Sequence, residues 1–338
     1  MGLNNRFIME ENISKTLTIK QILLAEILGV SVSAISKKAQ QLNIKLAEPE
    51  NVRKGYLVSE VNPVGAHFLR NHTTINRKIH VFYNFKGGTG KTTLTYQLSL
   101  MLYLMGFKIL LIDLDSQAHL TNLLGCSDSF NYPTIYDVLI QGKEIKQVIL
   151  EIFKGFDIVP SNLRLTKIEV PLSQKNRREE IMSRHISLLK DNYDFILIDT
   201  NPTISNLNIN ALFAADHINI VCETQPLSLN GLGVLIEELE EIYKEIGKPF
   251  NYSIWPNKYE SRTVIAQEVL GALRADYGES VVSLVIRKCE EFNHSSKIKQ
   301  PIFSFTNKKS PAFEDLKDFC QEFLKISTND LGEERKGQ

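Results

Sequence analysis

The sequence contains few cysteines, and none of them lies near another. They form no C-x-x-C pair and stand far apart, at Cys126, Cys222, Cys289 and Cys320. This spacing disfavours a zinc site, an iron–sulfur cluster and a disulfide framework. It fits a protein of a reducing compartment.

Long apolar runs and an excess of one charge are also missing. No apolar run approaches the roughly 20 residues that a membrane-spanning helix needs. The 39 basic and 39 acidic residues give a formal net charge of zero, so any contact with nucleic acid must come from a local patch. We therefore expect a cytoplasmic protein that does not bind membranes.

What the chain does have is length and apolar content. Its 338 residues, 43% of them hydrophobic, can form one large globular domain and a small one. Residues 1–47 are expected to form short helices. Residues 48–78 contain Pro49, Gly55, Pro63 and Gly65 and are expected to form a wing and linker. Residues 79–328 alternate apolar strands with amphipathic helices, and residues 329–338 form a polar tail.

The alternation in residues 79–328 predicts the fold class. Helices, for example 230–246, 263–277 and 312–326, separate nearly all of the expected strands. Such an order predicts an α/β fold with a mostly parallel sheet and helices on both faces, in which ligands bind at the carboxyl ends of the strands. The expected strands are residues 80–85, 108–114, 156–160, 195–199, 217–223, 252–255 and 281–286.

A glycine-rich segment, NFKGGTGKTTL at residues 84–94, links the first strand to a helix. Backbone N–H groups of such a loop can converge on an anion at the positive end of the helix. Lys91 supplies the cation that phosphate-binding loops place at the β- and γ-phosphates, and Thr92 offers a hydroxyl to Mg²⁺. Lys86 is surplus to this arrangement. The residues expected to bind phosphates are Gly87, Gly88, Thr89, Gly90, Lys91, Thr92 and Thr93.

Carboxylates end two further strands where the ligand of this loop would lie. KILLIDLDSQ ends with Asp113 and Asp115, and YDFILIDTNP ends with Asp199. One aspartate at such a place can hold Mg²⁺ or its water, and another can orient the attacking water. Either segment alone could equally carry a strand-ending or helix-capping carboxylate.

Together these motifs resemble the ParA/MinD group of deviant phosphate-loop ATPases, whose loop reads K-G-G-x-G-K-T-T. The resemblance runs from about residue 80 to residue 324 and includes SLNGLGVL, YESRT and SPAFEDL. Ser116, Asn201 and Thr89 depart from the common pattern, but none of them removes a ligand.

The resemblance implies roles for individual residues, with ATP and Mg²⁺ as cofactors. Lys91 would act within its own subunit, whereas Lys86 would reach the nucleotide of a partner in a homodimer. Asp115 would position the attacking water. Mg²⁺ would be held by Thr92, Asp113 and Asp199, and adenine would lie near Pro226 and Asn257.

The segment QILLAEILGVSVSAISKKAQQL, residues 21–42, has the spacing of a helix-turn-helix. Ala25 permits close helix crossing and Gly29 supplies the turn. Ile35, Ala39 and Leu42 are expected to point inward. A plain helical hairpin with a solvated basic face is the alternative. Major-groove contacts are expected from Ser33, Lys37, Lys38 and Gln41, and wing contacts to phosphates from Arg53 and Lys54.

The C-terminal third separates the family members that bind DNA from those that bind membranes. The last helix mixes acidic and apolar residues, and the tail STNDLGEERKGQ has no hydrophobic face, so membrane targeting is not expected. A basic cluster before residue 300 is expected to bind DNA non-specifically, although such clusters are often only solvated surface. The cluster comprises Arg287, Lys288, Lys297 and Lys299.

These observations favour a nucleoid-associated bacterial partition ATPase that forms an ATP-dependent homodimer and has its own operator-binding head. A ParB-like partner bound at a centromere-like site would stimulate weak hydrolysis. One alternative is a nucleotide-sensing transcriptional regulator without significant hydrolysis. Another is a MinD-like positioning ATPase.

Overall fold

A seven-stranded sheet forms the centre of the computed structural model, which describes residues 17–47, 55–126 and 132–328. The strand order is β5-β6-β4-β7-β3-β8-β9, and within this sheet every neighbouring pair is parallel except β5 and β6. The strands are β3 (Ile79–Tyr83), β4 (Ile109–Asp113), β5 (Leu150–Phe153), β6 (Phe156–Val159), β7 (Phe195–Asp199), β8 (His217–Glu223) and β9 (Tyr252–Asn257).

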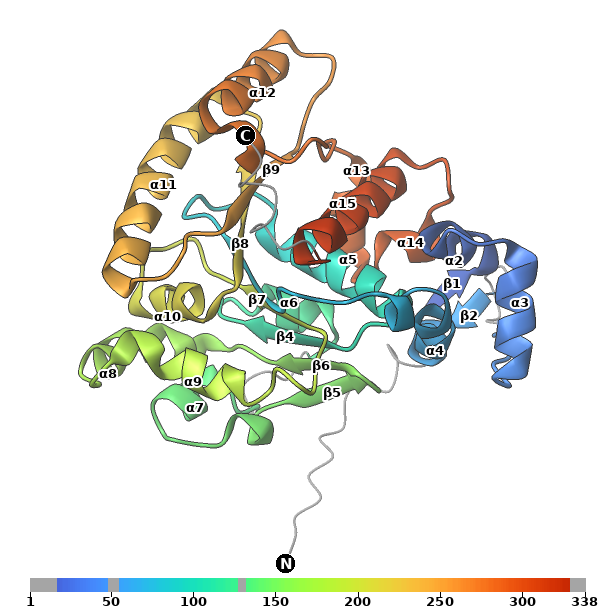
Figure 1. Cartoon of the computed structure of the whole chain (residues 1–338), viewed down its shortest axis with the longest axis horizontal. Coiled ribbons are helices and arrows are strands. Elements are labelled where there is room, and N and C mark those ends of the chain that lie inside the picture. The colour runs from blue at the N-terminus through green and yellow to red at the C-terminus, as the bar shows by residue number, and fades with distance from the viewer. Residues whose placement is uncertain (1–16, 48–54, 127–131, 329–338) are drawn as a thin grey trace, which may run out of the picture.

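Helices cover both faces of this sheet (Figure 1). One core contains the buried faces of α5 and α15, and a second contains those of α9, α10, α11 and α12. Adjacent strand residues alternate between them, since Phe82 belongs to the first core and Val81 to the second. The predicted fold class of this region is confirmed. The helices are α5 (Lys91–Leu104), α6 (His119–Leu123), α7 (Ile135–Leu139), α8 (Glu169–Ser173), α9 (Ile181–Ser187), α10 (Asn206–Ala214), α11 (Pro226–Ile246), α12 (Val264–Tyr277), α13 (Glu290–Ile298), α14 (Ile302–Phe305) and α15 (Pro311–Thr328).

The expected strand at residues 281–286 is wrong. This segment runs beside β9 and touches it through isolated bridges, and the main chain between them leaves the sheet. Ile286 donates its N–H to the carbonyl of Pro256 in β9. In a parallel pair, the N–H and C=O of one residue face the same neighbouring strand. Pro256 has no N–H, so it cannot donate the second hydrogen bond that would pair this segment with β9. Strand β5, by contrast, was not expected.

The N-terminal part contains a helix pair and a small sheet. Strands β1 (Thr18–Lys20) and β2 (Gly55–Leu57) pair antiparallel. Helices α2 (Gln21–Leu28) and α3 (Val32–Gln41) follow β1 and are joined by Gly29, whose φ of 66° lies in the left-handed region that glycine adopts readily. Ser31 caps α3 by accepting a hydrogen bond from the N–H of Ala34.

A helix stands where part of a linker was expected. Helix α4 (Val58–Phe68) contains Pro63, which leaves the carbonyl of Ser59 without its helical donor, and the hydroxyl of Tyr103 donates to that carbonyl instead. Gly65 lies against the end of α5, where an added Cβ would come 2.0 Å from the carbonyl oxygen of Leu104. Both residues typical of a linker therefore serve helix packing.

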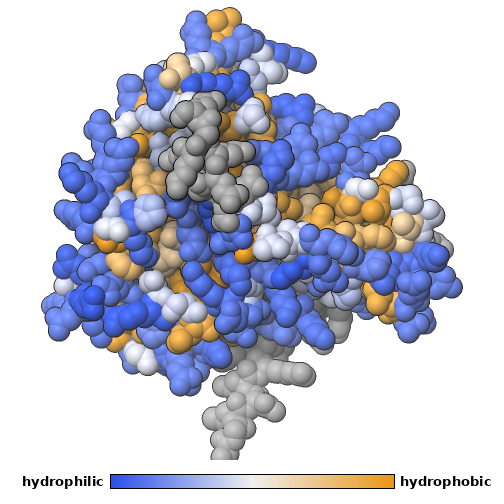
Figure 2. All heavy atoms as spheres, viewed as in Figure 1, coloured by the Kyte–Doolittle hydropathy of each residue, from blue (hydrophilic) through white to orange (hydrophobic). Residues whose placement is uncertain are grey.

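The N-terminal part shares the first core with residues 79–328 and packs directly against them. Buried residues of α2, α4 and α5 belong to one continuous cluster. Lys317 of α15 forms an ion pair with Glu26 at 2.8 Å, and Lys20 donates to the carbonyl of Thr306 at 2.6 Å. Figure 1 shows the blue N-terminal helices beside α14, and Figure 2 shows hydrophobic side chains gathered on the surface in that region.

Candidate functional site: a phosphate-binding loop and its surroundings

The glycine-rich loop lies between β3 and α5, at the carboxyl end of the sheet. Gly88 and Gly90 adopt positive φ angles of 77° and 99°. A Cβ on Gly90 would come 2.4 Å from Nδ2 of Asn257, which donates to the carbonyl of Thr89 at 2.7 Å. The loop favours glycine here because its φ of 99° lies in the left-handed region that other residues rarely adopt, and the amide of Asn257 leaves little space for a side chain.

Lys91 opens α5 and is buried, with only 6% of its surface exposed. Its Nζ donates to the carbonyl of Lys86 at 3.4 Å. Burial lowers the pKa of Lys91, while the nearby carboxylates of Asp199 and Asp115 oppose this shift. A buried cation at a helix N-terminus is well placed to meet a bound anion.

Asp199 lies next to Asp113 and Thr92, close to the glycine-rich loop. Asp113 accepts hydrogen bonds from the N–H and hydroxyl of Thr121, and burial raises the pKa of Asp113 to about 6. Asp199 accepts from the hydroxyl of Thr92 at 2.7 Å through one oxygen. Burial and the neighbouring Asp113 raise the pKa of Asp199 well above its ordinary value.

The other oxygen of Asp199 and the hydroxyl of Thr89 are buried and have no hydrogen-bond partner among the described residues. A carboxylate group with one unpaired oxygen, next to the hydroxyl of Thr92, suits Mg²⁺, which takes oxygen ligands. The residues present therefore fit a cation next to a bound phosphate.

Asp115 lies at the rim of the same space. It is half-buried, and one carboxylate oxygen accepts the N–H of Gln117 at 2.9 Å. Its own N–H donates to Asp113 at 3.0 Å, which fixes the turn after β4. The three aspartates predicted at strand ends are thus brought together at the carboxyl ends of β4 and β7.

Lys86 points away from the place that Lys91 occupies. Its Nζ donates to a carboxylate oxygen of Glu223 at 3.1 Å and to the hydroxyl of Ser228 at 2.9 Å. Lys258 binds the other oxygen of Glu223 at 2.7 Å. These contacts of Glu223, Ser228 and Lys258 were not predicted from the sequence, although Glu223 ends a predicted strand as Asp113 and Asp199 do.

A cavity of about 400 Å³ opens beside the loop. Its walls include Gly88, Asn257, Cys289 and Phe292. Asn257 was expected at a nucleotide base and does line this cavity. Pro226, the other expected base contact, begins α11, is exposed, and is not among the cavity's lining residues in the described part of the chain.

The four residues of the expected basic cluster do not form one patch. Arg287 is held by Asp315 through bonds of 2.6 to 3.0 Å, and this interaction raises the pKa of Arg287. Lys288 is exposed and pairs with Glu260 at 2.9 Å. Lys297 and Lys299 are exposed at the far end of α13. The guanidinium of Arg287, which was expected to bind DNA, is therefore engaged by a buried carboxylate.

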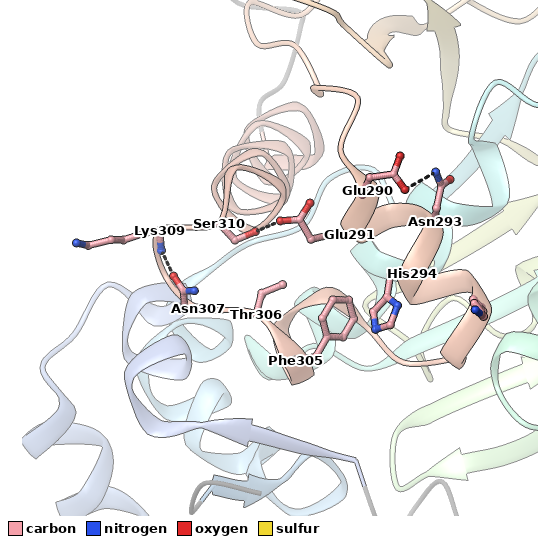
Figure 3. Close-up of a pocket in the computed structure, with 10 residues that line it drawn as sticks. Glu290, Glu291, Asn293, His294, Phe305, Thr306, Asn307, Lys309 and Ser310 are labelled. Atoms are coloured by element: carbon pink, nitrogen blue, oxygen red, sulfur yellow. Dashed lines mark hydrogen bonds between the residues drawn. The ribbon is translucent and has the colours of Figure 1, made fainter.

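Lys297 borders a second cavity, of about 890 Å³, between α13 and the segment before α15. Figure 3 shows its walls, with the ring of His294 against that of Phe305 and the hydroxyl of Ser310 donating to Glu291. Its lining includes both acidic residues, Glu290 and Glu291, and lysines, Lys297 and Lys309, so the cavity presents no single charge.

The outer face of α3 carries the residues expected to contact bases. Ser33, Lys37 and Gln41 are exposed and Lys38 is half-buried. Ile35 and Ala39 point inward as expected, but Leu42 is 38% exposed because it follows the end of the helix. Arg53, Lys54 and the tail at 329–338 lie outside the described residues. In the described part of the chain, no helix is both long and apolar enough to cross a membrane.

Relatives with curated names resemble most of the chain. A family model described as an AAA domain matches residues 77–252. The cell division protein PomZ of Myxococcus xanthus is 31% identical over 291 residues, which cover 85% of this chain and 86% of PomZ. The chromosome-partitioning ATPase Soj of Treponema pallidum is 30% identical over 230 residues, covering 68% of this chain and 90% of Soj.

Solved structures share the fold. The McdA–ATP complex of Cyanothece has a TM-score of 0.67 at 19% identity and covers 76% of this chain and 100% of McdA. A cobyrinic acid a,c-diamide synthase of Mycobacterium smegmatis, solved with an ATP analogue and magnesium, has a TM-score of 0.61 at 25% identity, covering 73% and 94%. With its two-lysine loop, its strand-end aspartates and these relatives, the chain belongs to the AAA domain family and, within it, to the ParA-type partition ATPases.

Proposed function

We propose that this chain is a DNA partition protein that binds ATP and Mg²⁺, dimerises on ATP and hydrolyses it weakly. The separation of its two loop lysines carries the proposal. Lys91 is buried beside Asp199, whereas Lys86 stands on the rim and points to Glu223 and Ser228. One lysine thus serves the subunit's own phosphates and the other is available to a second subunit.

Each site residue then has a task. The N–H groups of residues 87–93 and the ammonium of Lys91 bind the phosphates, and Asn257 borders the base. Thr92, Asp113 and Asp199 hold Mg²⁺, which supplies charge neutralisation at the β- and γ-phosphates. Asp115 orients the attacking water. The partner's Lys86 stabilises the spreading phosphoryl charge, as an arginine finger does, by about 10³–10⁵ in rate.

Two surfaces would meet DNA. The exposed face of α3, with Ser33, Lys37, Lys38 and Gln41, reads an operator and represses the chain's own operon. The second surface binds nucleoid DNA through phosphates alone. Because Arg287 is held by Asp315, we assign this second role to Lys288, Lys297 and Lys299. A ParB-like protein at a centromere-like site would stimulate hydrolysis and release.

Steady-state ATP turnover tests this proposal, measured alone, with DNA and with the product of the neighbouring reading frame. A partition ATPase should turn over slowly alone and faster with both additions. A rate that stays flat would favour the alternative, a nucleotide-sensing transcriptional regulator. Asp115→Ala is the matched variant: it should bind ATP, lose turnover and accumulate as a dimer in size-exclusion chromatography.

A MinD-like positioning ATPase is the third candidate, and the last helix argues against it. The apolar side chains of α15, including Phe313, Phe319 and Phe323, are buried in the first core. A membrane-binding helix would need that face free. Co-sedimentation with anionic vesicles in ATP would support the MinD-like candidate, and its absence beside DNA binding would support partition.

A further inference from the structure

A groove of about 430 Å³ lies between α10 and the last turns of α11. Figure 1 shows α10 beside the end of α11, on the side of the molecule opposite the blue N-terminal helices. Apolar side chains line it in two pairs, Ile209 with Phe213 from α10 and Ile242 with Ile246 from α11. The members of each pair are four residues apart, so both project from one face of their helix.

The groove offers apolar contact to an occupant. Three of its apolar side chains are half-buried and belong to neither hydrophobic core of the described residues: Ile209, Phe213 and Ile246. Its polar amide, that of Asn210, is used within the fold. This amide accepts the N–H of Met182 at 3.1 Å and donates to the carbonyl of Asn206 at 2.9 Å.

The two walls of the groove are fixed to each other. The hydroxyl of Tyr243, on α11, donates to the carbonyl of Leu212 at 2.6 Å. Lys248, just after α11, donates to the carbonyl of Phe213 at 2.5 Å and lies 4.1 Å from the centre of its ring. Carbonyls in the last turn of a helix lack regular helical donors, so these bonds also cap α10. The groove is therefore formed before any partner binds.

Carboxylates border the groove on both sides. Glu179 and Glu180 line it just before α9, and Glu245 lines it on α11. Of the described residues that line it, only Arg178 is a cation. Glu180 pairs with Arg177 at 2.9 Å, whereas Glu179 and Glu245 have no ionic partner among the described residues. The borders are thus negative, although the whole chain has a formal net charge of zero.

These features select one kind of occupant. Carboxylates on both sides repel nucleic acid and anionic lipid, and they attract lysine and arginine side chains. A groove with apolar side chains at helical spacing accepts an amphipathic helix, which inserts apolar residues three or four positions apart. The occupant that fits is a protein helix with an apolar stripe flanked by basic residues.

Helix α10 connects the groove to the phosphate site. Asp199, to which we assign Mg²⁺ binding, ends β7, and α10 begins shortly afterwards at Asn206. Asn208, in the first turn of α10, donates to the carbonyls of Asn201 at 3.1 Å and Thr203 at 2.6 Å. The helix that lines the groove therefore also positions the segment after Asp199.

We propose that this groove is the site at which the partner protein docks to stimulate hydrolysis, by placing a basic amphipathic helix between α10 and α11. The inference rests on the proposed function, which includes a stimulating partner, and it assigns that partner's chemistry and its place. Docking shifts α10 and, with it, the segment that follows Asp199.

Partner-stimulated ATP turnover tests the docking site. The full chain is assayed with ATP, Mg²⁺ and DNA while the purified product of the neighbouring reading frame is titrated. Glu179→Gln/Glu245→Gln should raise the partner concentration that gives half-maximal stimulation by about fivefold, and by less at high salt, because exposed charges are screened. Glu237→Gln/Glu240→Gln is the matched control. It removes the same charge from exposed positions of α11 outside the groove and should change nothing.

Ile246→Ser tests the apolar part of the groove. It should raise the half-maximal partner concentration by about tenfold at any salt concentration. Leu188→Ser is its control, since Leu188 is 69% exposed and lies outside the groove. Turnover without partner, and maximal stimulation at saturating partner, should match wild type in every variant, because the groove sets affinity and not chemistry. Should the serine variant melt early, the glutamine pair still decides.

Wild-type titration curves for both groove variants would overturn the docking site and leave the proposed function standing. Equal shifts in the groove pair and the control pair would also overturn it, since they indicate a general charge effect. Altered self-association of the groove variants in sedimentation, with partner response unchanged, would assign the groove to a second copy of the chain instead. A wild-type chain that does not respond to the partner at all would overturn partner stimulation in the proposed function, and the docking site with it.

Discussion

Asp113 and Asp199 lie directly opposite each other on the neighbouring parallel strands β4 and β7, with both carboxyl groups buried. Two like charges in one dry space repel, and a cation would relieve the repulsion. Without a cation the pair is a source of instability that the site retains for its chemistry.

Asp199→Asn should therefore stabilise the nucleotide-free chain by about 1 kcal/mol, because one of the two charges is removed. The same change should abolish the stabilisation that ATP and Mg²⁺ give to wild type, seen as a rise in melting temperature and equal to about 2.7 kcal/mol of unfolding free energy at a ligand concentration of 100 Kd. Thermal unfolding with and without the nucleotide measures both effects. A variant that is less stable than wild type without nucleotide would show that the repulsion is unimportant.

Mixing two inactive variants tests whether Lys86 acts across the dimer. Lys86→Ala should bind ATP but hydrolyse it poorly, and Lys91→Ala should lose binding, since Lys91 is the buried lysine beside Asp199. In a mixed dimer, the Lys91→Ala subunit can still lend its Lys86 to the intact loop of the other. Random association should restore up to about one quarter of the wild-type rate. No recovery at any ratio, in mixtures where cross-linking shows that mixed dimers form, would place Lys86 in its own subunit's site.

Salt dependence of DNA binding separates the basic residues of the C-terminal third. Removing Lys297 and Lys299 together should flatten the slope of log K against log salt by about two units on any duplex, since each phosphate contact contributes about 0.9. Arg287→Ala is the contrast: it should leave the slope unchanged but cost about 2 kcal/mol of stability, because Asp315 loses its partner. Equal slopes for wild type and the double variant would remove α13 from the DNA surface.

Operator binding provides a separate test of α3. Lys37→Ala should weaken binding to DNA upstream of the chain's own gene by about 1–3 kcal/mol while sparing random DNA, if the helix reads base edges. Fluorescence anisotropy on both fragments measures this. Equal losses on both would mean that α2 and α3 form only a basic helical hairpin.

His80 predicts a pH dependence of stability. Burial lowers its pKa to about 4, and its ring is satisfied as the neutral form: Nε2 meets the carbonyl of Arg77 and Nδ1 faces the amide of Asn219. That amide is oriented by Trp255, which donates to its oxygen at 3.0 Å, so a protonated Nδ1 would meet a donor. Asp216 and Arg77 also influence the pKa of His80, while His80 and Arg77 influence the pKa of the neighbouring His217.

Between pH 6.5 and 4 the unfolded chain therefore binds a proton at this position that the folded chain does not. Above pH 6.5 neither state binds it and stability is unaffected. The unfolding free energy of wild type relative to His80→Gln should fall by up to about 1.4 kcal/mol per pH unit as pH drops through this window. Urea unfolding of both chains at pH 7.5, 6 and 5 measures the difference. A difference independent of pH would mean that His80 has the same pKa in the folded and the unfolded chain.

Much of the central sheet could be predicted because buried parallel strands are nearly continuous apolar runs. Strand β5 escaped because it is short and partly exposed, with Glu151 in its middle, although Lys154 and Gly155 provide a hairpin turn before β6. Helix α4 was not predicted because Pro63 and Gly65 are residue types that usually interrupt helices. Only the neighbouring α5, through Tyr103 and Leu104, makes them suitable there.

The loop and the strand-end aspartates could be predicted because their chemistry is local in sequence. The partners of Lys86 could not, since Glu223 and Ser228 are more than 130 residues away and follow from the order β3-β8-β9. The pairing of Arg287 with Asp315 was hidden for the same reason. A lysine or arginine in a sequence has no visible counter-ion until the fold supplies one.

Helix α5 begins at Lys91, to which we assign phosphate binding, and ends beneath Gly65, where the main chains of α4 and α5 come into direct contact. Its 14 residues span roughly 21 Å at 1.5 Å per residue. The helix therefore connects the proposed nucleotide site at one end rigidly to the N-terminal helices at the other. A tilt of roughly 5° at the loop would displace the far end by roughly 2 Å over that length. Because the main chains of α4 and α5 are in direct contact, this displacement would move α4 as well. The exposed face of α3 would then turn together with the proposed phosphate site.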